Sequence, residues 1–228
     1  MRKAIVLSSG GIDSTTCLAM AINEFGTENV VSVSAIYGQK HSKEIECARK
    51  ISTYYGVAHR EIDITSLNIF EGSTCTLLKE NAGSVAQGTY AEQVNEGIVS
   101  TYVPFRNGVL LSLVAAMALS MFPNDEILIY VGIHLDDVIG AAYADCTFQF
   151  ADAMNEAIRA GTYGKVGVSA PLVDWTKADV VRVGHQLGAP FELTWSCYNG
   201  GEHPCGTCAT CLDRKKAFEA NNLKDPVV

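Results

Sequence analysis

The sequence predicts an α/β protein in which a Rossmann-like parallel sheet carries helices on both faces. Short apolar runs rich in β-branched residues alternate with longer segments whose apolar residues recur at helical spacing. A glycine turn directly follows the first apolar run, where such sheets bind their ligands. Four cysteines close together near the end of the chain predict a small metal-binding knuckle beside the sheet.

The first part of the chain alternates regularly between strand and helix. Apolar runs predict the strands, and segments of helical periodicity that stop at Gly26 and Gly56 predict the helices. In chain order the predicted elements are strand 3–7, helix 13–24, strand 29–36, helix 42–55 and strand 57–64. Strands joined through helices pair in parallel by right-handed crossovers, and ligands bind outside their carboxyl ends.

The rest of the chain is less regular. Residues 65–100 show no sustained periodicity and are rich in Gly, Ser, Thr and Asn, so we expect a long excursion that could order over a bound ligand as a lid. Beyond it we predict a helix at 107–121, a strand at 126–131, helices at 147–159 and 177–187, and a cysteine knuckle at 195–211 followed by a short helix.

The loop at residues 8–14, Ser-Ser-Gly-Gly-Ile-Asp-Ser, has the composition of a phosphate cradle. Adjacent Gly10 and Gly11 let the backbone approach an anion closely, and the amides of the following helix then point toward it. Asp13 would repel phosphates unless a divalent cation lies between them or its carboxylate caps the helix. The loop lacks the lysine of a Walker motif and the spacing of a dinucleotide fingerprint. An ordinary glycine turn is the alternative interpretation.

The cysteine cluster follows a C-x7-C-x2-C-x2-C pattern, formed by Cys197, Cys205, Cys208 and Cys211. Four thiolates suit a closed tetrahedral zinc site, which holds structure rather than performing chemistry. Two alternatives remain open. The last three cysteines match the spacing of an iron–sulfur ligand run, and the thiols could also carry no metal.

Length and composition indicate one well-buried core with an appendage, because 228 residues at 48% hydrophobic content are too few for two full domains. The net charge of −8 gives no overall attraction to nucleic acid. The apolar run at 109–122 is too short to span a bilayer, and the run after Met1 ends too early for a secretory signal. We therefore expect a cytoplasmic protein without nucleic-acid or membrane partners. The apolar helices and the long excursion leave room for a dimer, so we also expect a homodimer.

Taken together, these motifs resemble the 7-cyano-7-deazaguanine synthase family of PP-loop ATP pyrophosphatases. The loop alone resembles the SGGxDS motif of that superfamily, whose members split ATP between the α and β phosphates. The narrower likeness rests on the cysteine pattern and on three internal motifs that stand in the family's order: YGQKH at 37–41, VPFRN at 103–107 and AYADC at 142–146. The resemblance runs nearly from end to end.

The resemblance implies an ATP-dependent conversion of 7-carboxy-7-deazaguanine and ammonia to the nitrile, through adenylated carboxylate and amide intermediates, in queuosine biosynthesis. It also implies two parts of the chain, an ATP-binding α/β domain at 1–190 and a zinc-binding segment at 191–228. The alternatives are a deazapurine amide ligase with another amine acceptor, such as a protein, and a tRNA-modifying enzyme of the superfamily. The acidic chain argues against the latter.

Site residues follow from the same resemblance. The pyrophosphate portion of ATP would lie against the loop and the start of its helix, with Mg²⁺ at Asp13. Assigned to the nucleotide are Ser8, Ser9, Gly10, Gly11, Ile12, Asp13, Ser14 and Thr15. Assigned to the heterocyclic substrate are Tyr37, Gln39, Lys40, Arg106, Asn107, Asp136, Tyr143 and Asp145. We assign catalysis to Asp13, Lys40 and Arg106.

Side-chain chemistry supports the charged assignments but leaves alternatives open. Arg106 can bind a carboxylate or phosphate in bidentate fashion. Lys40 could supply positive charge to the same groups, or be a solvated lysine that pairs with Glu44 one helical turn later. His41 could transfer a proton, or simply belong to the start of the helix.

The remaining assignments concern aspartates and aromatic residues. Asp136 and Asp137 follow a predicted strand, and one of them could touch ligand or metal rather than cap a helix. Tyr143 could stack on a heterocycle whose amino and ring NH groups Asp145 accepts, unless the two are a core aromatic residue and a turn aspartate. Phe105 stands where part of the family carries glycine.

Overall fold

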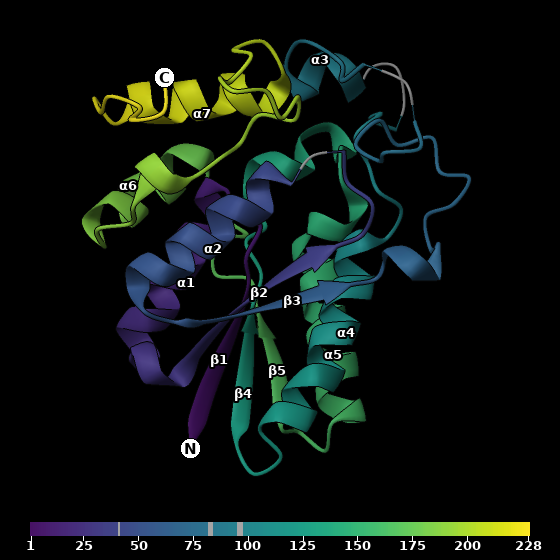
Figure 1. Ribbon diagram of the computed structural model, residues 1–228, viewed down its shortest axis with the longest axis vertical. Helices are drawn as coiled ribbons and strands as arrows, with labels where there is room; N and C mark the ends of the chain where they lie inside the picture. Colours follow the sequence, from purple (N-terminus) through teal and green to yellow (C-terminus); the bar gives the residue numbers. More distant parts are fainter. Residues whose placement is uncertain (41, 82–83, 95–97) are drawn as a thin grey trace.

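A computed structural model describes residues 1–40, 42–81, 84–94 and 98–228, and its centre is a five-stranded sheet (Figure 1). The strands are β1 (Arg2–Leu7), β2 (Val30–Ile36), β3 (Ala58–Asp63), β4 (Glu126–Tyr130) and β5 (Val166–Ser169), in the order β3-β2-β1-β4-β5. All four pairings between these strands are parallel. The strand order reverses at β1, so the connections after β1 and its neighbours diverge and leave a crevice at their carboxyl ends.

Helices cover both faces of this sheet (Figure 1). On one face lie α1 (Ile12–Phe25), α2 (Lys43–Tyr55) and α6 (Lys177–Gln186), and on the other lie α4 (Arg106–Met121) and α5 (Phe148–Gly161). The predicted fold class, a parallel sheet covered on both sides, is confirmed.

Alternation along β1 divides the core between the two faces. Ala4 and Val6 pack in one buried cluster with Leu18 of α1, whereas Ile5 packs in the other with Leu111 of α4. All five residues are almost completely buried. A strand buried on both faces reads as a continuous apolar run rather than an alternating one, and residues 4–7 of the sequence have that character.

The predicted boundaries of these elements lie within two residues of the observed ones. Apart from short 3-10 turns, two described elements were not predicted: β5 and the short helix α3 (Tyr90–Val94). β5 is only four residues long and contains Gly167, so its apolar residues form no distinguishable run. The apolar segment at 109–122 forms most of α4, and no helix in the described part of the chain is long and apolar enough to cross a membrane.

The excursion between β3 and α4 packs across the end of β2 and against the C-terminal segment. The backbone carbonyl of Leu77 accepts a hydrogen bond from the backbone N–H of Lys40 at 2.9 Å. The backbone N–H of Lys79 donates to the carbonyl of Gly38 at 2.8 Å. Further along, Gly88 donates to the carbonyl of Thr207 at 3.1 Å. These contacts place the described part of the excursion beside the crevice. Its closure as a lid stays a prediction.

The C-terminal segment shares the core of the sheet domain. α7 (Ala209–Ala220) packs against α6, and Phe218 belongs to the same buried cluster as Leu18. Arg214 is 3% exposed and donates to both carboxylate oxygens of Asp225 at 2.7 and 2.8 Å, which fastens the end of the chain to α7. Short 3-10 turns complete the described chain: η1 (Thr27–Asn29), η2 (Thr65–Leu67), η3 (Leu135–Ala141), η4 (Ala144–Cys146) and η5 (Phe191–Leu193).

Candidate functional site

A cleft of about 230 Å³ opens at the carboxyl ends of β1, β2 and β4. Its wall combines the loop after β1, the end of β2, the first turns of α2, α4 and α6, and parts of the segment 195–213. This is the crevice at the strand reversal, where open α/β sheets bind their ligands. Elements far apart in the sequence therefore meet in one concave site.

The predicted phosphate loop forms one wall of the cleft. α1 begins at Ile12, so the amides of its first turn have no helical acceptor and remain available to an anion. Ser14 Oγ accepts from the backbone N–H of Ser9 at 3.1 Å and lies 3.2 Å from Ser9 Oγ. The loop is thus held in shape by its own hydroxyls, with the N-terminus of α1 directed at the cleft.

Gly10 is required by the packing of this loop. Its φ is 81°, in the left-handed region, and a methyl group on its Cα would overlap the carbonyl oxygen of Glu44. Its own carbonyl accepts from the N–H of Trp195 at 2.9 Å. Gly11 differs, because its φ is −88° and a methyl group there would meet only ordinary van der Waals neighbours. The loop is therefore clamped between α2 and the C-terminal segment at Gly10.

Asp13 is the centre of a partly buried charge cluster. Both of its carboxylate oxygens accept from Lys177 Nζ, at 2.7 and 2.6 Å, and His134 Nε2 lies 3.8 Å away. Burial opposes ionisation, but Lys177 and His134 outweigh it and hold the pKa of Asp13 below its usual value. Burial likewise opposes the charge of Lys177, yet Asp13 and Asp137 raise the pKa of that ammonium. Both groups are therefore charged at neutral pH.

His134 connects this ion pair to Asp137. Its Nε2 lies 3.2 Å from Lys177 Nζ and 3.4 Å from Asp137 Oδ1, while its buried Nδ1 has no hydrogen-bond partner among the described residues. The cluster thus places two carboxylates and a lysine beside the phosphate loop.

Arg106 occupies the opposite side of the cleft. Its guanidinium makes long contacts, 3.3 to 3.4 Å, with the side-chain oxygens of Tyr37 and Asn107, and it forms no salt bridge with any described residue. Burial raises the pKa of the nearby Glu44 to about 7, although Arg106 opposes that shift. A partly buried guanidinium without a salt bridge to a described carboxylate is a ready binding point for an anionic ligand.

The floor of the cleft beside Arg106 is built from buried polar pairs and tyrosines. Asp145 accepts from the backbone N–H of Asn107 at 2.9 Å and so satisfies the N-terminus of α4. Tyr143 donates to or accepts from Thr101 at 2.6 Å, and its ring packs edge-to-face on Tyr90. These aromatic rings give the cleft an apolar end suited to a planar heterocycle.

The structure brings most of the predicted site residues together. The cleft is lined by Ser8, Ser9, Gly11, Ile12, Asp13, Ser14, Tyr37, Gln39, Arg106, Asn107, Tyr143 and Asp145. Gly10, Thr15, Lys40 and Asp136 are not part of the lining. His41 lies outside the described residues.

Asp136 differs from the prediction in its surroundings. Its carboxylate accepts from the backbone N–H of Lys177 at 2.7 Å, at the first residue of α6, whereas its neighbour Asp137 lines the cleft. Gln39 lines the cleft, but its side-chain amide hydrogen-bonds to the backbone: it accepts from the N–H of Tyr37 and donates to the carbonyl of Ala35. Asp137 rather than Asp136 therefore faces the ligand space.

Several cleft residues escaped sequence reasoning, chiefly Lys177 and His134. Lys177 carried one usable signal: a lysine in the first turn of a helix opposes the helix dipole, which asks for a compensating role. The compensating partner is Asp13, which lies 164 residues away in the sequence, so no pattern near Lys177 indicates the ion pair. His134 is a lone histidine between strand and turn, and nothing in its neighbourhood distinguishes it.

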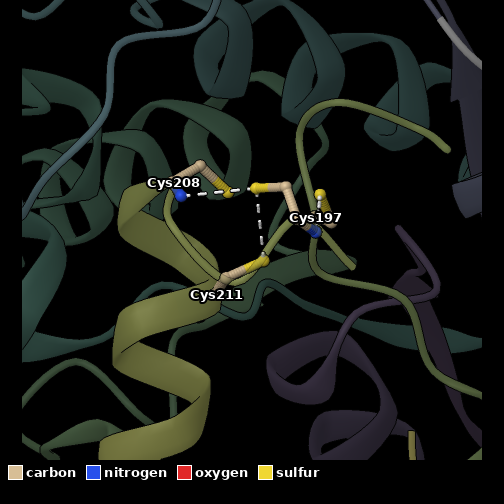
Figure 2. A group of neighbouring side chains, drawn as sticks. Cys197, Cys208 and Cys211 are labelled. Atoms are coloured by element: carbon tan, nitrogen blue, oxygen red, sulfur yellow. Dashed lines mark hydrogen bonds between the residues drawn. The ribbon is translucent and has the colours of Figure 1, made fainter. Parts of the chain in front are cut away.

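The four cysteines converge as predicted. The side chains of Cys197, Cys208 and Cys211 gather at the N-terminal end of α7 (Figure 2), and with Cys205 their sulfurs all lie within 4.8 Å of one another. The backbone N–H of Cys205 points to Cys197 Sγ at 3.3 Å, and that of Cys208 points to Cys205 Sγ at 3.4 Å. These residues could hold a metal ion, and Ser196, Tyr198 and Thr210 between them line the cleft.

Comparison with known proteins gives consistent matches. The family described as queuosine biosynthesis protein QueC matches residues 3–222. The 7-cyano-7-deazaguanine synthase of Archaeoglobus fulgidus is 41% identical over 227 residues, covering 99% of this chain and 90% of the relative. The 7-cyano-7-deazaguanine synthase of Pseudoalteromonas atlantica is 39% identical, covering 100% and 98%. The solved NMN synthetase of Francisella tularensis shares the fold at 12% identity, with a TM-score of 0.52 over 97% of this chain and 78% of that one. The chain belongs to the family of the queuosine biosynthesis protein QueC.

Proposed function

We propose that the chain converts 7-carboxy-7-deazaguanine and ammonia to 7-cyano-7-deazaguanine, using ATP. The observation that carries this proposal is one cleft that holds both the Arg106 guanidinium, which has no salt bridge with any described residue, and the open helix N-terminus after the phosphate loop. The guanidinium suits a substrate carboxylate, and the helix N-terminus suits the phosphates of ATP. Family membership agrees with this substrate pair, because relatives at about 40% identity carry the name of this activity.

The chemistry requires two activations. A carboxylate is a poor electrophile because attack on it must expel oxide. Transfer of AMP to the carboxylate, with loss of pyrophosphate, makes that oxygen a leaving group, and ammonia then gives the primary amide. A second transfer of AMP, to the amide oxygen, allows that oxygen to depart and leaves a carbon–nitrogen triple bond. The enzyme's contribution is alignment and stabilisation of charge.

The residues of the cleft divide between the two ligands. Loop residues 8–15 would bind the pyrophosphate portion of ATP, and Lys177 could add charge to it once released from Asp13. Asp13 and Asp137 offer carboxylate oxygens of the kind that hold Mg²⁺, which when bound neutralises the leaving pyrophosphate. Tyr37, Tyr143 and Asp145 would receive the deazaguanine. The assignment of Lys40 to catalysis stays a prediction.

The metal of the cysteine knuckle is proposed to be zinc. With bonds of about 2.3 Å, a tetrahedral zinc site places its sulfurs about 3.8 Å apart, which fits sulfurs that all lie within 4.8 Å. A four-iron cluster binds each thiolate to a different iron and needs a wider ring of sulfurs. Zinc would hold the wall formed by Ser196, Tyr198 and Thr210 without taking part in the reaction.

The direct test is incubation of pure protein with ATP, Mg²⁺, ammonium and 7-carboxy-7-deazaguanine, followed by mass analysis of the products. We expect the nitrile together with AMP and pyrophosphate. A product that stops at the amide, or that carries another amine, would change the proposed end product. The absence of both AMP and pyrophosphate would refute the proposed activity.

A further inference from the structure

We propose that Glu44 is the general base of the reaction, taking up protons that leave nitrogen as the amide and then the nitrile form. The inference rests on the proposed function. It concerns a residue that the sequence offered only as the helical partner of Lys40.

The reaction needs such a base. Attack of ammonia on the adenylated carboxylate forms a C–N bond, breaks the C–O bond to AMP and releases one proton from nitrogen. Transfer of AMP to the amide oxygen forms an O–P bond, expels pyrophosphate and releases one N–H proton. Departure of AMP breaks the C–O bond while the last N–H proton leaves, and its electron pair completes the triple bond. A carboxylate beside the reacting carbon can accept these protons.

Glu44 lies where the two ligands must meet. It is in the first turn of α2 and lines the cleft, and its backbone carbonyl is the group against which Gly10 of the phosphate loop packs. Across from it is Arg106, the proposed binding point of the substrate carboxylate. The carboxylate that becomes adenylated would therefore lie between the guanidinium and the phosphate loop, next to Glu44.

The carboxyl of Glu44 has no hydrogen bond or ion pair with any described residue. Other carboxylates of the cleft are occupied: Asp13 by Lys177, Asp137 by the backbone N–H of His134, and Asp145 by the N-terminus of α4. Asp213 also has no hydrogen bond or ion pair with a described residue, but it lies in the field of Lys177. Of these two carboxyls, Glu44 is the one in the field of Arg106.

The electrostatic surroundings suit proton uptake near neutral pH. Arg106 of α4 favours the charged form of the Glu44 carboxyl, but burial of that carboxyl has the larger effect and raises its pKa. Tyr37 at the end of β2 and Cys47 of α2 are the titratable groups on which the charge of Glu44 acts. The resulting pKa of Glu44, about 7, is close to the value at which a general base works best.

The test compares Glu44→Gln with wild type in two assays, one that reports adenylation and one that reports proton removal. Adenylation of the carboxylate needs no base, so exchange of pyrophosphate into ATP with 7-carboxy-7-deazaguanine should stay within about threefold of wild type. Conversion of the corresponding amide to the nitrile, which needs a base and no ammonia, should fall by about 10²–10⁴-fold. In wild type that conversion should rise with pH up to about 7, following the carboxyl of Glu44, and the variant should lose this rise.

Glu46→Gln is the matched control, because Glu46 is exposed on the same helix and outside the cleft lining. Both activities of that variant should equal wild type. Nitrile formation by Glu44→Gln within about threefold of wild type would overturn the proposal, and an equal loss of exchange and nitrile formation would make Glu44 structural. A wild-type protein that makes no nitrile would instead refute the proposed function.

Discussion

Lys177 donates to both carboxylate oxygens of Asp13, joining the first turn of α6 to the first turn of α1 across 164 residues of sequence. The Asp13 carboxylate thereby lies near the N-termini of both helices, where negative charge is favourable. Because Asp13 and Lys177 are 22% and 14% exposed, the pair lies between a surface and a fully buried ion pair. The pair ties the helix that follows the phosphate loop to α6.

Lys177→Met should destabilise the fold, because it leaves the carboxylate of Asp13 partly buried and unpaired. Breaking a buried pair from one side costs about 3–5 kcal/mol, and the partial exposure here favours the lower end. Urea unfolding of Lys177→Met, Asp13→Asn and the double variant gives the coupling between them. Strictly additive effects would show that the two side chains do not interact.

Glu44 should make stability depend on pH in an unusual direction. Its pKa of about 7 lies above the ordinary value of 4.5, so between these pH values the folded chain holds a proton that the unfolded chain has lost. Stability should therefore fall as pH rises through this window, by about 3 kcal/mol in total. The difference between wild type and Glu44→Gln in urea unfolding at pH 4.5, 5.5 and 7 measures it, and a constant difference would contradict the raised pKa.

Gly10→Ala and Gly11→Ala should have different effects on folding. At Gly10 the φ of 81° alone costs an alanine about 1 kcal/mol, and overlap with the Glu44 carbonyl adds to this. At Gly11 the backbone is ordinary and a methyl group fits, so the unfolding free energy should change by about 0.5 kcal/mol or less. Thermal unfolding compares the two, and equal losses would show that the loop is not clamped at Gly10.

Removal of the metal should unfold the cleft wall but leave the sheet. Structural zinc contributes about 10–16 kcal/mol of binding free energy in zinc-finger peptides, so a strong chelator or Cys205→Ser should open the segment 197–211 to proteolysis and abolish pyrophosphate release. Far-UV circular dichroism should change little, because the strands lie elsewhere. Cys75→Ala, at a buried cysteine outside the knuckle, should keep one zinc per chain by metal analysis. Iron in place of zinc would contradict the proposed site.

The sheet and most of its helices were predictable because their information is local. Apolar runs and helical periodicity mark β1 to β4 and the long helices, while the four residues of β5 are too few for any pattern. The phosphate loop was found because its glycines sit at a strand end. Phe105 has a φ of 52°, so a residue other than glycine adopts the left-handed conformation there.

Side-chain partnerships were beyond the reach of the sequence. Whether Asp136 or Asp137 faces the cleft depends on about a third of a turn of η3, which adjacent aspartates do not reveal. The choice between Glu44 as a partner of Lys40 and Glu44 as a cleft carboxyl depends on where α4 places Arg106, more than sixty residues later in the chain. Such contacts are set by tertiary packing, so residue type and spacing carry no record of them.

Substitution of Arg106 should separate the two halves of the reaction. In the proposed reaction the acid substrate would bring a carboxylate to the guanidinium, whereas the amide intermediate is neutral, and a hydrogen bond to a charged group contributes about 1.5–3 kcal/mol. Arg106→Met should therefore lower kcat/KM for 7-carboxy-7-deazaguanine by about 10–150-fold and change that for the amide much less. Arg106→Lys should recover part of the loss, since a lysine restores the charge but not the bidentate geometry. Equal losses for acid and amide would assign Arg106 to the phosphates of ATP, which both half-reactions use.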